Sequence, residues 1–79
     1  MRLDKYLKVS RLIKRRTVAN EACDAGRVQA NGRPVKASYE VKNGDILEIG
    51  FGNRSVKVRV LDTKETVRKE EADGMFEYL

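Results

Sequence analysis

The sequence contains no histidine and no tryptophan, and its only cysteine is Cys23. A single cysteine excludes an internal disulfide, and without histidine neither a Ser-His-Asp triad nor a Cys-His pair can form. The usual zinc sites are excluded for the same reason. An enzyme built on Asp or Glu alone stays conceivable, but 79 residues leave little room for a pocket. We therefore expect no catalysis, no metal and no cofactor.

Long apolar runs are also missing, since none approaches the ~20 residues needed to cross a bilayer. The first residues do not resemble a signal peptide, because charged side chains begin at Arg2. Charged residues make up 37% of the chain and hydrophobic residues 41%, which is typical of a folded domain with a solvated surface. We expect one small domain that stays in the cytoplasm.

Acidic residues are scarce at the start of the chain. Residues 1–16 hold seven Lys or Arg against Asp4 alone, whereas residues 62–79 hold six acidic and three basic side chains. The net charge of +5 is therefore concentrated at one end. Such asymmetry favours a polyanionic partner that approaches from one side. The alternative is a charged face that is only solvated.

Two helices are predicted first. Leu3, Leu7 and Ser10 recur at three- and four-residue spacing and predict a helix from Arg2 to about Arg11. Residues 12–15 are expected to form a turn. A second helix is predicted from about Arg16 to Ala25, ended by Gly26. Its narrow face of small residues should pack closely on the first helix and contains Val18, Ala19, Ala22 and Cys23.

From Gly26 the hydrophobic period changes to two, which predicts strands. Asn31-Gly32 indicates a tight hairpin turn, and Pro34 places the return strand at an edge. Further strands are predicted at 46–49 and 55–61, the second with Val56, Val58 and Val60 inward. In the tail, residues 68–73 could form a short helix that Gly74 ends, leaving residues 75–79 to dock on the core. The sequence therefore predicts an α+β domain.

Phosphate binding needs several cations on a rigid surface, and each neutralised phosphate adds affinity through counterion release. Arg16 stands where the second helix begins, so free backbone N–H groups would add partial positive charge there. Arginine's planar guanidinium also matches the geometry of phosphate. The candidate RNA-binding residues are Arg2, Lys5, Lys8, Arg11, Lys14, Arg15 and Arg16, with Lys36 and Arg33 beside the hairpin as second-rank candidates.

A family resemblance becomes visible at this point. Arg2-Leu3-Asp4 is followed at fixed spacing by Arg16 and Ala19, then by Gly26, Val28, Ala30, Asn31-Gly32, Gly44-Asp45 and Ile46. Across residues 2–49 this order closely resembles the S4 RNA-binding domain. The resemblance implies two helices packed on a small antiparallel sheet of hairpins. It also implies an S4 domain over residues 1–62 and an acidic extension over 63–79 that packs on the domain or trails from it.

Within that superfamily, the segment Lys5–Arg16 and the tail Lys69-Glu70-Glu71-Ala72 resemble the bacterial ribosome-associated quality-control factors, kin of the small heat-shock S4 protein. This resemblance implies binding to stalled large ribosomal subunits, at the rRNA hairpin helix 69 and at P-position peptidyl-tRNA. It implies support for an RqcH/NEMF-type partner that adds alanine tails to the nascent chain. It further implies a ribosome-associated monomer without a membrane partner. Arg2 and Arg16 match family positions that touch RNA.

Several alternatives stay open. Lys5, Lys8 and Lys14 are either RNA contacts or solvated, and Arg11 either binds RNA or pairs with Asp4. Arg15 stands where many S4 domains have a capping Ser or Thr, so it leaves the second helix without that cap or adds a phosphate contact. The alternative functions are a general S4 chaperone of ribosomal subunits, a targeting module of an RNA-modifying enzyme, and a protein-interaction module that docks through residues 65–77.

Overall fold

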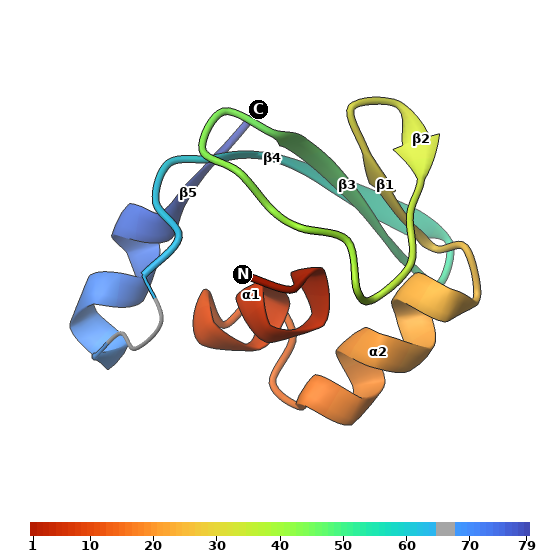
Figure 1. Cartoon of the computed structure of the whole chain (residues 1–79), viewed down its shortest axis with the longest axis horizontal. Helices are drawn as coiled ribbons and strands as arrows, with labels where there is room; N and C mark the ends of the chain where they lie inside the picture. Colours follow the sequence, from red (N-terminus) through yellow and green to blue (C-terminus); the bar gives the residue numbers. More distant parts are fainter. Residues whose placement is uncertain (65–67) are drawn as a thin grey trace.

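Two helices cover one face of a five-stranded antiparallel sheet in the computed structural model, which describes residues 1–64 and 68–79 (Figure 1). The strand order is β2-β1-β3-β4-β5. This arrangement confirms the predicted α+β fold. No helix within these two ranges is long and apolar enough to span a membrane. The elements in chain order are α1 (Leu3–Val9), α2 (Arg16–Asp24), β1 (Val28–Ala30), β2 (Arg33–Pro34), β3 (Ile46–Phe51), β4 (Arg54–Val60), the 3₁₀ helix η1 (Lys69–Met75) and β5 (Phe76–Tyr78).

The first helix ends two residues earlier than predicted. Ser10 is its C-cap, and Arg11 adopts a left-handed backbone conformation with φ of 65°. The chain turns here because Ile13 must reach the core, where it is buried and its N–H donates to the Leu7 carbonyl at 3.0 Å. The other end of α1 rests on the loop before β3, since the N–H groups of Leu3 and Asp4 donate to loop carbonyls. The helix is thereby fixed at both ends.

The second helix matches its predicted range closely. Arg15 is the N-cap and makes no side-chain capping hydrogen bond, as the missing Ser or Thr indicated. Gly26 follows the helix with φ of 78°. The predicted face of small residues is buried at Ala19, Ala22 and Cys23, but the inclusion of Val18 was wrong. Val18 is 46% exposed.

The hairpin predicted at Asn31-Gly32 is present. Both residues have positive φ, and Pro34 lies in the edge strand β2. Asp45 holds this hairpin to the long loop, because its carboxylate accepts hydrogen bonds from the Tyr39 hydroxyl at 2.8 Å and from the Asn31 amide at 3.2 Å. Burial alone would raise the pKa of Asp45, but these bonds and one from the Lys42 N–H lower it. Asn31 is therefore a structural residue.

The predicted inward row of valines is confirmed at Val58 and Val60, which are fully buried, while Val56 is only half-buried. Leu3, Tyr6 and Leu7 from α1 meet these strands and complete the core. Tyr6 also reaches the C-terminal segment, because its hydroxyl donates to the Met75 carbonyl at 2.7 Å. Burial and the negative charge of Asp62 raise the pKa of Tyr6, so the hydroxyl remains a donor.

The tail differs from its prediction. The short helix is a 3₁₀ helix that continues through Gly74, and Phe76–Tyr78 then pairs with β4 as a fifth strand. Met75 and Phe76 are buried as expected, but Tyr78 and Leu79 are exposed and do not dock on the core. A strand of three residues is too short to show a periodic pattern. Residues 65–67 of the predicted interaction tail lie outside the described residues.

The contact between α1 and the tail gives a first prediction. Tyr6→Phe should lower the free energy of unfolding by about 1 kcal/mol, the usual contribution of one buried hydrogen bond. The loss stays modest because the Met75 carbonyl keeps the Leu61 N–H as a donor. Urea unfolding measures the change. Tyr78→Phe is the matched control, because Tyr78 is 69% exposed, and it should change stability by less than about 0.5 kcal/mol. If Tyr6→Phe and Tyr78→Phe change the free energy of unfolding equally, the hydrogen bond from Tyr6 to Met75 does not stabilise the fold.

Candidate RNA-binding face

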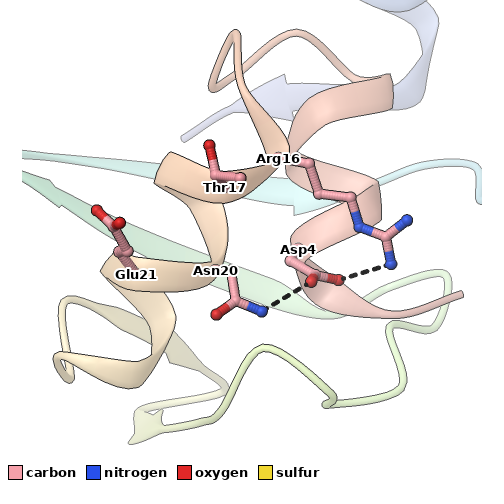
Figure 2. Close-up of a pocket in the computed structure, with 5 residues that line it drawn as sticks. All are labelled: Asp4, Arg16, Thr17, Asn20 and Glu21. Atoms are coloured by element: carbon pink, nitrogen blue, oxygen red, sulfur yellow. Dashed lines mark hydrogen bonds and ion pairs between the residues drawn. The ribbon is translucent and has the colours of Figure 1, made fainter.

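The buried carboxylate of Asp4 lies between α1 and α2 and organises this face (Figure 2). Its oxygens accept hydrogen bonds from Arg2 Nε at 3.2 Å and Nη2 at 3.3 Å, from Arg16 Nη2 at 3.4 Å and from Asn20 Nδ2 at 3.1 Å. The Lys5 N–H donates a further bond at 2.8 Å. One acid therefore joins the N-terminal residues, the first turn of α1 and the first turns of α2.

These donors keep Asp4 ionised. Burial alone would raise its pKa, but the hydrogen bonds from Arg2, Asn20, Arg16 and the Lys5 N–H outweigh that effect and lower the pKa to about 2. A buried carboxylate costs several kcal/mol unless it is paired and hydrogen-bonded, which is the case here. Two guanidinium groups thus surround one negative charge, and the group as a whole stays positive.

The two arginines remain available to a ligand. Their side chains are about half exposed, at 49% for Arg2 and 45% for Arg16. A guanidinium has five N–H donors, and Arg16 uses Nη2 toward Asp4. The other donors of Arg16 can therefore bind phosphate oxygens. A hollow of about 380 Å³ adjoins Arg16 and is lined by Asp4, Arg16, Thr17, Asn20 and Glu21 (Figure 2).

The suggested pairing of Asp4 with Arg11 was wrong. Asp4 bonds instead to Arg2 and Arg16. The pairing fails because α1 ends at Val9 and the left-handed backbone at Arg11 directs the chain elsewhere before a second helical turn can align the two side chains. Arg11 lines a different hollow, together with Arg54 and Tyr78.

The structure separates the remaining candidate residues. Lys8, Lys14 and Arg15 are exposed, and Lys5 is half-buried. Lys36 lies at the far end of α2, where its Nζ donates to the Asp24 carbonyl at 3.5 Å. Lys14 lines a hollow on the side of α2 that carries Val18. The candidate cations are therefore spread over different parts of the surface, and the guanidinium groups of Arg2 and Arg16 are held by Asp4.

Sequence reasoning treated Asp4 as a local structural residue and overlooked Asn20. Two signals were available. Asp4 is the single acid within a run of seven cations, and Asn20 follows Arg16 by four residues, so both side chains lie on one side of α2. Neither signal says which cations the acid binds, because that depends on how the two helices pack.

Comparison with known proteins places the chain in a family. A family model described as the S4 domain matches residues 1–47. A protein of Halalkalibacterium halodurans named RQC P-site tRNA stabilizing factor is 58% identical over 98% of this chain and 88% of that protein. A protein of the same name in Bacillus subtilis is 56% identical over the whole chain and 92% of its own length. The chain therefore belongs to the S4 domain family, and within it to the proteins named RQC P-site tRNA stabilizing factor.

A solved structure supports the same fold. The structure of Vibrio cholerae Heat Shock Protein 15, described as trimeric, superposes with a TM-score of 0.92 at 26% sequence identity. It covers the whole of this chain, and the match spans 81% of that protein. The likeness therefore includes β5 and η1, which lie beyond the part matched by the family model.

Asp4 predicts a defined response to acid. Its pKa is about 2 in the folded chain against an ordinary 3.8, so its stabilising effect is complete above about pH 4 and is lost as the pH falls toward 2. The full effect amounts to roughly 2 kcal/mol. Asp4→Asn should remove this stabilisation at neutral pH. The free energy of unfolding of the variant should also fall less steeply in acid, as measured by urea unfolding over a pH series.

Glu21→Gln is the matched control, since Glu21 lines the same hollow but is exposed. It should leave stability unchanged within about 0.5 kcal/mol. An Asp4→Asn chain as stable as the wild type at neutral pH would show that the carboxylate does not hold the two helices.

Proposed function

We propose that the chain is a non-catalytic RNA-binding factor of ribosome-associated quality control. In this proposal it binds stalled large ribosomal subunits, at helix 69 of the rRNA and at P-position peptidyl-tRNA, in the cytoplasm. It thereby supports alanine tailing of the nascent chain by an RqcH/NEMF-type factor. The relatives' name, RQC P-site tRNA stabilizing factor, supports the role at tRNA. The observation that carries the proposal is the Arg2–Asp4–Arg16 arrangement within an S4 domain.

The arrangement suits binding by shape and charge. Asp4 fixes the directions of two guanidinium groups, so little side-chain freedom remains to be lost when they meet phosphates. Recognition of this kind reads the spacing of a folded RNA backbone more than its bases. It needs no chemical step, because stabilising tRNA requires only that the bound state is favoured.

The contributing residues fall into two groups in this proposal. Arg2 and Arg16 make the positioned contacts. Lys5, Lys8, Arg15 and Lys36 supply electrostatic attraction at longer range. We leave Arg11 and Lys14 out of the RNA-binding group, because both line hollows away from Asp4.

Removing one positioned guanidinium should abolish most of the binding. Arg16→Ala should reduce co-sedimentation with stalled large subunits at least tenfold. The slope of log affinity against log salt concentration should become shallower by about one, because one fewer phosphate is neutralised. Arg59→Ala is the matched control. It removes the same charge from the opposite face of the sheet, where Arg59 pairs with Glu77, and it should bind as the wild type does. Equal binding by both variants would refute the site.

The role of tRNA separates the proposal from the general chaperone. Both functions use rRNA, but only the proposed one requires peptidyl-tRNA in the subunit. The chain should therefore bind large subunits that carry peptidyl-tRNA more tightly than subunits that carry no tRNA. The same affinity for both, measured by sedimentation at one salt concentration, would favour the chaperone function.

A further inference from the structure

A second concave surface lies on the side of α2 away from Asp4. An open hollow of about 410 Å³ has Leu12, Ile13, Val18, Ala22 and Phe51 among its lining residues. A second hollow of about 230 Å³ shares Leu12 and Phe51 and continues toward Val56 and Tyr78. We call the two together the hairpin groove, because Phe51 belongs to the hairpin of β3 and β4.

The hairpin groove and the Asp4 site lie on different sides of α2. Residues of an α-helix are spaced by about 100°, so Arg16 and Asn20 share one side, while Val18 and Ala22 share another about 200° further round. The lining residues agree with this geometry, because the Asp4 hollow and the hairpin groove share none of their described lining residues. A ligand in the hairpin groove would therefore leave the RNA-binding face accessible.

Apolar side chains are exposed at both ends of the hairpin groove. Val18 at one end is 46% exposed and Tyr78 at the other is 69% exposed. The Tyr78 ring stands edge-on to the Phe76 ring, with centroids 5.1 Å apart, so its position is defined by packing. Exposed apolar side chains that line a hollow are typical of a binding surface.

Among the described residues, the charged side chains that line the hairpin groove are all basic. Lys14 and Arg27 flank the larger hollow, and Arg11 and Arg54 flank the smaller one. Within residues 1–64 and 68–79, none of these four forms an ion pair with an acidic side chain. Arg2, Arg16 and Arg59, by contrast, each have an acidic partner. The groove therefore carries uncompensated positive charge around an apolar floor.

We propose that the hairpin groove binds an extended acidic segment of a partner protein, one that carries apolar side chains between its carboxylates. Apolar side chains would fill the floor between Val18 and Phe51, and carboxylates would pair with the arginines at the rim. Single-stranded RNA fits less well, because the polar edges of its bases would lie unpaired against aliphatic Leu12, Ile13 and Val18. The proposal does not rest on the RNA-binding function.

Peptide display tests this proposal directly. A library of random peptides about ten residues long, enough for one extended strand, is selected on the wild-type chain. We expect enrichment of peptides that combine Asp or Glu with Leu, Ile or Phe. In fluorescence anisotropy they should bind Arg54→Glu at least tenfold more weakly than the wild type, and Tyr78→Ser should also weaken them. Thermal unfolding checks that each variant is folded.

Two controls make the outcome decisive. Arg33→Glu changes the net charge equally at the exposed edge strand β2, outside the groove, and should bind the peptides as the wild type does. Arg16→Ala should also retain them. The proposal is overturned if no such peptides are enriched, or if Arg54→Glu and Arg33→Glu bind them equally. It is also overturned if an oligouridylate, rather than a peptide, is the ligand whose binding depends on Arg54 and Tyr78.

Discussion

The buried charge of Asp4 constrains the rest of this small domain. An ionised carboxylate in a protein interior is tolerated only while donors surround it, and here the donors come from Arg2, Arg16, Asn20 and the Lys5 backbone. A shift of α2 along α1 would take the Arg16 and Asn20 donors away from that charge. Because Arg2 also pairs with Glu40 through a backbone bridge, the same contact extends to the loop before β3. The relative positions of three segments are thus set by one side chain.

This constraint involves a compromise between order and charge. Asp4 cancels part of the positive potential that attracts RNA, which taken alone weakens binding. In return it holds two guanidinium groups at fixed positions, so that less conformational entropy is lost on binding. The compromise is tolerable because other cations near the chain's start supply attraction over distance, and such attraction does not depend on exact geometry. Positioned contacts and diffuse charge are therefore provided by different residues.

Local patterns explain what could be predicted from the sequence. The hairpin at Asn31-Gly32 and the end of α2 at Gly26 depend on backbone conformations that few residues adopt, so the residue types identify them. The partners of Asp4 could not be read in this way, since Arg16 and Asn20 reach it only through the packing of α2 on α1. The strand Phe76–Tyr78 was missed because it exists through pairing with β4, a contact between distant residues.

The wrong prediction for Val18 has a structural cause that also concerns the hairpin groove. Its spacing placed it on the small-residue face that packs on α1, but α2 is rotated so that Ala19, Ala22 and Cys23 fill that interface. That rotation is the one that brings Arg16 and Asn20 to Asp4. A β-branched residue then stands half exposed at a helix position where Ala or Lys would favour the helix more. Val18 contributes to neither the core nor the solubility of the chain, and in the proposed complex it would contact the apolar side chains of the bound segment.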